Sequence, residues 1–118
     1  MKIWLIQVET AWKDKAKNLL KIHSYVDRAA KDRVNLIVFL ELALTGYSCG
    51  IDFFSLAEPI PGPSTKEIMG RAVRENLYIL LGLPELGEAC LYNSAVLFGP
   101  RGKFVSEADP VWRAIFRR

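Results

Sequence analysis

The chain has 118 residues, of which 51% are hydrophobic and 25% are charged, and its formal net charge is +3. This length and composition fit one globular domain that can bury a core. Arg113, Arg117 and Arg118 contribute much of the positive charge, so the rest of the chain is close to neutral. Acidic and basic residues alternate elsewhere without an aromatic–basic pattern, and we therefore expect no nucleic-acid partner.

Targeting and redox signals are weak in this sequence. The apolar N-terminal stretch is short and is interrupted by Gln7 and Glu9, unlike a secretory leader. No stretch approaches the ~20 apolar residues that a membrane span needs. Cys49, Cys90 and the single histidine have neither disulfide nor metal-ligand spacing. We expect a cytoplasmic protein with no membrane contact, no metal and no cofactor.

The first part of the chain predicts a strand, a helix and a second strand. Residues 3–8 are mostly apolar and short, which indicates a strand. Residues 14–33 have apolar side chains at steps of three and four, which indicates an amphipathic helix with His23 at the edge of its buried stripe. Residues 35–40 are apolar on both faces, which is typical of a central parallel strand.

The second part predicts a helix followed by strands. Ser64 and Glu67 have the spacing of a capping box, and Asn76 can end the helix that they begin. Strands are predicted at residues 77–83, 92–98 and from 103 onward, with a loop or hairpin turn over ELGEACLY (85–92) and a tight turn at 99–102. This order indicates an α/β fold whose helices connect parallel neighbouring strands.

Two glutamates directly follow predicted strands, at the edge where open α/β sheets bind ligands. Glu41 ends the apolar run LIVFLE, and a carboxylate in apolar surroundings becomes a general base suited to neutral pH. A structural carboxylate that caps a helix or pairs with an arginine explains the same pattern, and the residues alone leave both open. Glu85 lies in PELGE, which we expect to be a solvated loop.

Several segments together resemble the N-terminal part of the nitrilase superfamily, the carbon–nitrogen hydrolases. They are NLIVFLELALTGY (35–47), EPIPGPST (58–65), ENLYILLGLPE (75–85) and LYNSAVLFGPRGKFV (91–105). The resemblance implies a partial α-β-β-α sandwich, here mainly one mixed sheet with two helices. It makes residues 1–105 the N-terminal portion of a hydrolase domain and 106–118 a divergent basic and aromatic tail.

The resemblance also implies a function. Members of this family hydrolyse a non-peptide C–N bond of a small amide or nitrile to carboxylate and ammonia, using a Glu-Lys-Cys triad. The family's glutamate falls on Glu41, where it would take the proton of the attacking thiol. Tyr47 and Asn93 are expected to contact the substrate. Packing for Tyr47 and strand-end capping for Asn93 remain open alternatives.

The sequence departs from the family where the remaining triad members are expected. No lysine follows Lys103, and neither Cys49 nor Cys90 matches the position of the nucleophile. We therefore expect a truncated chain that is inactive alone. The alternative is a non-catalytic α/β association module that keeps Glu41 as a relic; a flavodoxin-like binding domain is a third option, although no phosphate-binding loop is present.

Truncation would also leave one apolar face of the sheet uncovered. Apolar patches of more than a few hundred Å² usually have a partner. We therefore expect a homo-oligomer, most simply a homodimer, formed through that face.

Overall fold

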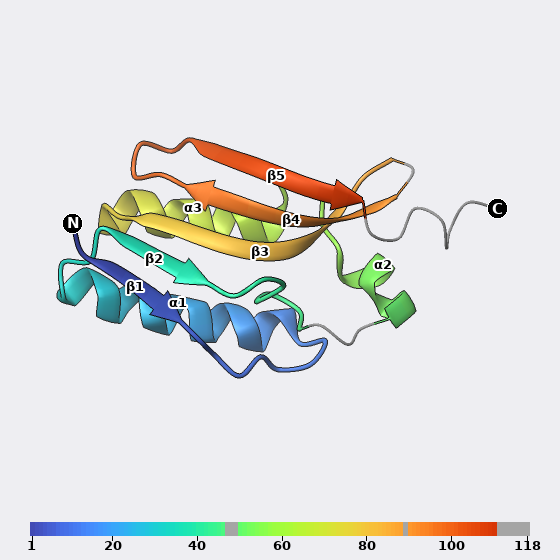
Figure 1. Cartoon of the computed structure of the whole chain (residues 1–118), viewed down its shortest axis with the longest axis horizontal. Helices are drawn as coiled ribbons and strands as arrows, with labels where there is room; N and C mark the ends of the chain where they lie inside the picture. Colours follow the sequence, from blue (N-terminus) through green and yellow to red (C-terminus); the bar gives the residue numbers. More distant parts are fainter. Residues whose placement is uncertain (47–49, 89, 111–118) are drawn as a thin grey trace.

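The computed structural model describes residues 1–46, 50–88 and 90–110. Its elements follow the chain in Figure 1 as β1 (Ile3–Ile6), α1 (Lys15–Lys31), β2 (Leu36–Phe39), a 3₁₀ turn (Gly50–Asp52), α2 (Phe53–Leu56), α3 (Pro63–Glu75), β3 (Tyr78–Leu86), β4 (Leu91–Phe98) and β5 (Phe104–Pro110). Within these ranges no helix is both long enough and apolar enough to cross a membrane. The α/β order predicted from the sequence is confirmed.

The strands form one mixed sheet in the order β1-β2-β3-β4-β5. β1, β2 and β3 run parallel because α1 and α3 provide the crossovers between them, whereas β4 and β5 pair antiparallel through short turns. The predicted turn at residues 99–102 is confirmed, since the Gly99 amide donates to the carbonyl of Lys103 at 2.8 Å. The mixed sheet is therefore the one expected.

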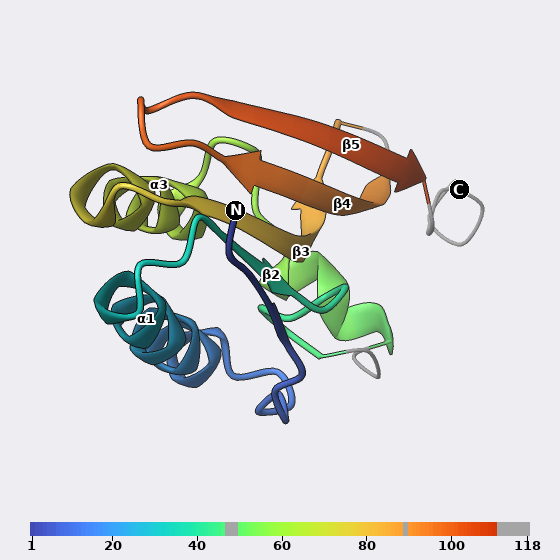
Figure 2. The same ribbon diagram turned by 60° about the vertical axis from the view of Figure 1, so that its left-hand side comes forward.

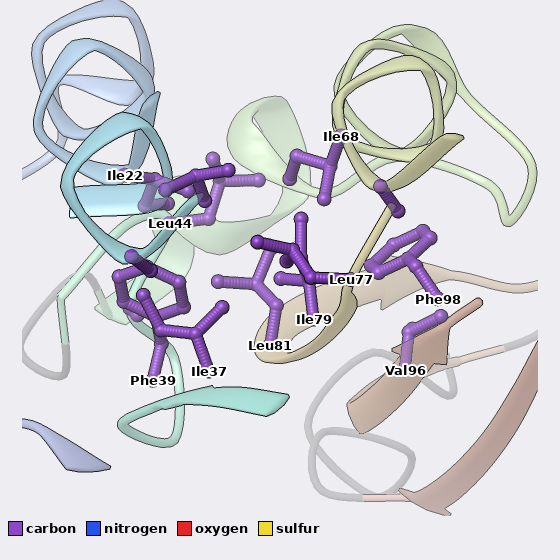
Figure 3. Packing of buried hydrophobic residues seen from close by; sticks show 14 of the residues in the cluster. Ile22, Ile37, Phe39, Leu44, Ile68, Leu77, Ile79, Leu81, Val96 and Phe98 are labelled. Carbon is purple, nitrogen blue, oxygen red and sulfur yellow. The ribbon is translucent and has the colours of Figure 1, made fainter. Parts of the chain in front are cut away.

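α1 and α3 lie side by side on the same face of the sheet (Figures 1 and 2). His23 on α1 lies 2.8 Å from Glu67 on α3, and Arg71 of α3 pairs with Asp27 of α1. His23 is partly buried, as expected at the edge of the stripe. The core between helices and strands includes these labelled residues of Figure 3: Ile22, Ile37, Phe39, Leu44, Ile68, Leu77, Ile79, Leu81, Val96 and Phe98.

Among the residues that the structure describes, no helix lies over the opposite face of the sheet, here called the open face. Ile37 and Phe39 of β2 are buried under the helices, while Leu36 and Val38 are partly exposed on the other side. At its two ends the open face exposes 77% of Leu5 and 69% of Val105. The strands therefore carry apolar side chains on both faces, but the described residues cover only one face fully.

The predicted capping box at Ser64 and Glu67 is wrong. α3 begins at Pro63, and the cap is Gly62, whose N–H donates to Thr65 Oγ1 at 2.7 Å. Proline suits the first position of a helix because its missing N–H would have no partner there. Ser64 instead donates to Glu58. At the other end Asn76 stops the helix in the left-handed conformation, with φ of 53°, as predicted.

A hairpin turn joins β3 to β4, one of the two predicted alternatives, but it is shorter than the predicted segment 85–92. β3 continues to Leu86 because its end pairs with β4, up to Leu86 and Leu91. The backbone of Glu58 pairs with the other edge of β3: the Glu58 amide donates to the carbonyl of Pro84 at 3.3 Å and the Leu86 amide donates to the carbonyl of Glu58 at 2.8 Å. The expectation of a solvated loop at Glu85 is therefore wrong. Glu85 is partly buried in β3, and its carboxylate accepts a hydrogen bond from Ser94 Oγ at 2.7 Å.

The buried carboxylate of Glu58 connects three elements. It accepts hydrogen bonds from the backbone amide of Ser64 at 2.7 Å, from the Ser64 hydroxyl, and from Lys15 Nζ at 2.9 Å. Burial by itself raises the pKa of Glu58, but the hydrogen bonds from Ser64 and Lys15 outweigh it and hold that pKa below its ordinary value. Glu58 thus fixes the starts of α1 and α3 against the end of β3.

Replacing Glu58 by Gln should lower the free energy of unfolding by about 2 kcal/mol at pH 7, because charge-assisted hydrogen bonds are lost. A lowered folded pKa stabilises the protein at pH values above the unfolded pKa, and this stability is lost as the pH falls through the folded pKa. The difference between wild type and variant should therefore shrink in acid. Urea denaturation between pH 7 and pH 3 measures this difference in unfolding free energy, and Glu88→Gln, which changes an exposed carboxylate, is the control. A difference that grows in acid would contradict a lowered pKa for Glu58 in the folded protein.

Candidate active site

Glu41 begins the turn that follows β2. Hydrogen bonds within residues 40–46 close this turn, including one from the Gly46 amide to the carbonyl of Leu42 at 2.8 Å. Leu42 adopts a left-handed conformation with φ of 51°, which costs a non-glycine residue about 1 kcal/mol. Such strain persists only where the surrounding structure fixes the backbone. The position of Glu41 is therefore imposed by the fold around it.

Gly82 allows this turn to cross β3. A Cβ atom at Gly82 would lie 2.6 Å from the backbone nitrogen of Leu42 and 2.8 Å from Cα of Glu41. Only a glycine permits so close an approach of two backbones. The crossing carries Glu41 from the end of β2 over β3 to the side chains of β4.

Glu41 and Asn93 meet at the end of this crossing. Nδ2 of Asn93, on β4, donates a hydrogen bond to Oε1 of Glu41. The structure thus brings together two of the three residues predicted from the sequence, whereas Tyr47 lies outside the described residues. Asn93 directly contacts the candidate base.

The expected apolar burial of Glu41 is not found, since this residue is exposed. The crossing places it on the open face, where no other described element covers it. Its apolar neighbours in sequence, Phe39 and Leu44, are buried on the helix-covered side instead. The apolar run around Glu41 reflects the core beneath it rather than the surroundings of its own carboxylate.

A cleft of about 260 Å³ lies beside Glu41. It is lined by Phe39, Glu41, Leu80, Leu81, Gly82, Asn93, Ser94, Ala95 and Glu107. Glu107 of β5 contributes a second carboxylate that the sequence analysis did not single out. No lysine or arginine is among the described residues that line the cleft. The arrangement can therefore accept a proton, but these residues offer no cation for a developing oxyanion.

Sequence reasoning also missed Asn18. This buried side chain on α1 accepts from the Ala11 amide at 2.6 Å and donates to the carbonyls of Ala11 at 2.8 Å and Leu44 at 2.9 Å. It thereby ties the turn after Glu41 to the first helix. A signal was present, because Asn18 falls four residues before Ile22 on the apolar stripe, where a polar residue requires partners.

Comparison with known proteins shows the family of this chain. Residues 2–111 match the family model described as carbon-nitrogen hydrolase. The chain belongs to the carbon–nitrogen hydrolase family. The match includes β5, which runs to Pro110, and the division into residues 1–105 and a tail at 106–118 stays a prediction.

Curated relatives of this carbon–nitrogen hydrolase chain include nitrilases and amidases. A nitrilase from Pyrococcus abyssi is 34% identical over 105 residues, covering 86% of this chain and 40% of that protein. An (R)-stereoselective amidase from Pseudomonas sp. is 31% identical over 102 residues, which cover 86% of this chain and 37% of that protein. The omega-amidase from Mus musculus is 34% identical over 103 residues, covering 86% and 36%. The chain thus spans about 40% of the length of these relatives or slightly less.

Solved structures share the fold. A CN-hydrolase superfamily protein from Xanthomonas campestris, with an arsenic adduct in its active site, superposes with a TM-score of 0.82 at 23% identity. The superposition covers 91% of this chain and 39% of that one. An amidase from Nesterenkonia sp. gives a TM-score of 0.79 at 21% identity, covering 92% and 42%.

Substituting Gly82 by Ala should displace the turn at Glu41 and break its contact with Asn93, because the new Cβ collides with backbone. The free energy of unfolding should fall by about 1–3 kcal/mol, as in other overpacked sites. NMR signals of the Asn93 side-chain amide and thermal denaturation measure the two effects.

Gly70→Ala is the matched control for this substitution. A Cβ at Gly70 meets no atom within 4 Å, and alanine should stabilise helix α3 by up to about 1 kcal/mol. An Asn93 amide that keeps its wild-type signals in the Gly82 variant would show that the crossing does not position Glu41.

Proposed function

We propose that Glu41 is the general base of a carbon–nitrogen hydrolase site that acts on a small amide or nitrile, and that Asn93 orients its carboxylate. The observation that carries this proposal is the contact between Asn93 and Glu41 beside a cleft. A structural carboxylate would be expected to cap a helix or pair with an arginine. Glu41 instead begins a turn, and its carboxylate accepts a hydrogen bond from the side-chain amide of Asn93.

The geometry suits proton transfer. Asn93 donates to Oε1 of Glu41, which leaves Oε2 to take a proton from a thiol. With an amide, the resulting thiolate attacks the carbonyl carbon and ammonia leaves with the proton that Glu41 took; one water then hydrolyses the thioester to carboxylate and thiol. A nitrile reacts in the same way but consumes two waters. An amide that holds one carboxylate oxygen limits rotation of the base.

Residues 1–118 supply the base of this proposed site but not the other members of the triad. No lysine follows Lys103, and Cys90 is buried in a turn. Members of a catalytic triad act as a unit, so one of them alone gives little rate. In this proposal the 118 residues do not hydrolyse amides by themselves. A cytoplasmic location accompanies the proposal and rests on cysteine usage alone.

A second candidate function is non-catalytic association, with Glu41 as a relic. The observation in its favour is the open face, where Leu5 and Val105 expose 77% and 69% of their surface. The two candidates make different predictions for Glu41. Only the first requires its carboxylate to accept a proton during turnover.

A chimera tests the first candidate directly. Residues 2–105 of this chain would replace the matching part of the Pseudomonas sp. (R)-stereoselective amidase, which retains its own downstream residues. Acrylamide is a suitable first substrate, since a double mutant of the amidase from Nesterenkonia sp. AN1 was solved in complex with it. We expect ammonia release from the chimera, and a loss of about 10²–10⁴-fold in kcat on Glu41→Gln. Asn93→Leu should cost about 10-fold or more in kcat.

Glu9→Gln, which changes an exposed carboxylate outside the cleft, is the matched control and should leave kcat unchanged. A folded chimera that hydrolyses acrylamide equally well with Glu41→Gln would refute the role of Glu41 as a base. A folded chimera with no activity would favour the association module. The isolated 118-residue chain should release no ammonia above background in the same assay.

A further inference from the structure

The layer formed by α1 and α3 concentrates the positive charge of the chain. The two helices contain eight lysines and arginines but only three acidic residues, a formal charge of +5, whereas the whole chain carries +3. This layer covers the face of the sheet opposite to the open face (Figures 1 and 2). The field around the two helices therefore attracts anions, most strongly at low ionic strength.

A groove of about 490 Å³ lies between α1 and α3 at the surface of this layer. It is lined by His23, Asp27, Lys66, Glu67, Gly70, Arg71 and Arg74. We call it the interhelix groove. Sites for small molecules usually have roughly 300–1,000 Å³, so the interhelix groove has room for an anionic group together with a small molecule that carries it.

The two acidic side chains in the interhelix groove already have partners on the opposite helix. Glu67 of α3 lies 2.8 Å from Nε2 of His23 on α1, and Asp27 of α1 accepts a hydrogen bond from Arg71 on α3. Because a carboxylate only accepts hydrogen bonds, Nε2 of His23 carries the proton of the first contact. Both acids are thus engaged, and the charges that remain for a ligand are positive.

Two basic side chains of α3 lie on either side of a glycine. Lys66, Gly70 and Arg74 follow at steps of four residues, which places them in line on the groove side of the helix, about 6 Å apart along its axis. A Cβ atom at Gly70 would meet no atom within 4 Å. Lys66 forms no ion pair with another described residue, and Arg74 pairs among them only with Glu75, at 3.7 Å. Space for an anion therefore exists over Gly70, between two cations.

Arg71 supplies a third cation in the interhelix groove. Both of its hydrogen bonds use Nη2, one to Asp27 and one to the backbone carbonyl of His23 at 3.1 Å. Its Nε atom and Nδ1 of His23 are buried without a hydrogen-bond partner among the described residues. Buried polar atoms are nearly always paired, so two such atoms beside one groove indicate a site whose polar groups the described residues do not fully satisfy.

We propose that the interhelix groove binds a phosphate group, either free or carried by a small molecule. The phosphate lies over Gly70, with Lys66 and Arg74 on either side of it. A guanidinium binds two phosphate oxygens at once, which suits Arg71, whereas lysine acts as a point charge. The groove is in the helical layer, away from the cleft at Glu41, so the proposal does not depend on a catalytic role for that residue.

The charge of the ligand sets the expected preference and affinity. A phosphate monoester carries about 1.5 to 2 negative charges at pH 7, whereas a carboxylate carries one. The Coulomb attraction of phosphate to each cation is larger in proportion. Lys66 and Arg74 are exposed, and solvent weakens their contacts. We therefore expect a dissociation constant on the order of 1 mM for inorganic phosphate at low salt.

An NMR titration of the isotope-labelled 118-residue chain with inorganic phosphate tests the site. Amide signals of residues 66–74 should shift to saturation, and binding should weaken about 10-fold or more between about 20 mM and 500 mM salt. Acetate should bind about fivefold more weakly than phosphate, because it carries one charge. Glycerol 3-phosphate identifies the source of the phosphate: tighter binding than inorganic phosphate indicates a phosphate monoester, and weaker binding indicates free phosphate.

Gly70→Glu and Gly70→Gln form a matched pair of variants. Both should raise the melting temperature, since glycine is a poor helix former. The glutamate also places a negative charge one turn from Lys66 and one turn from Arg74, where the phosphate would lie. Phosphate binding should therefore fall about 10-fold or more in Gly70→Glu, and clearly less in Gly70→Gln, whose side chain has the same size but no charge.

Removal of the cations provides an independent test. Lys66→Gln and Arg74→Gln should each weaken phosphate binding about 3–10-fold, because each removes a charged hydrogen-bond donor. Lys31→Gln is the control: it removes an exposed cation of α1 that does not line the interhelix groove, and it should change binding less than about twofold. This control separates a local site from general attraction by the basic layer.

Several outcomes would overturn the proposal. They are no saturable shift at residues 66–74 up to about 50 mM phosphate, equal binding of acetate and phosphate, unchanged binding in Gly70→Glu, and a loss in Lys31→Gln as large as that in Lys66→Gln. Circular dichroism confirms that each variant is folded. The chimera described above contains both helices, so the same titration applies to it if the 118-residue chain does not fold alone.

Discussion

The close approach of two backbones at Gly82 is the constraint on which the candidate site depends. Parallel strands end at the same edge of a sheet, but β3 lies between β2 and β4 and would keep Glu41 and Asn93 apart. The turn after β2 passes over Gly82 and closes this gap. The missing side chain of one residue thus decides whether the base and its hydrogen-bond donor meet.

Local patterns predicted the elements of the fold well. The apolar stripe located α1, and Asn76 was identified as the end of α3 because its left-handed conformation is common there. The start of α3 was misplaced because Ser64 and Glu67 have partners outside the predicted capping box, Glu58 and His23. A capping pattern in sequence cannot reveal a carboxylate or imidazole supplied by another segment.

The geometry of the candidate site was foreseen only in part, and the catalytic roles of its residues stay predictions. Resemblance to the carbon–nitrogen hydrolases indicated Glu41 and Asn93, but their direct contact depends on the crossing at Gly82, which no local signal in the sequence predicted. The exposure of Glu41 could not be inferred from its neighbours, because Ile37 and Phe39 of this apolar run pack beneath the helices while the Glu41 carboxylate emerges on the other face. Periodicity in the sequence shows which side chains share a face of a strand. It does not show which elements cover that face, and this cover decides burial.

The three hydrogen bonds of Asn18 have a consequence for how the candidate base is held. The side-chain amide of Asn18 on α1 forms hydrogen bonds with the backbone of Ala11 and of Leu44, which belong to separate segments. Thermal motion of the turn at Glu41 is therefore linked to that of the first helix, although the two are 23 residues apart in sequence. The position of the Glu41 carboxylate thus depends partly on α1, although no α1 residue lines the cleft.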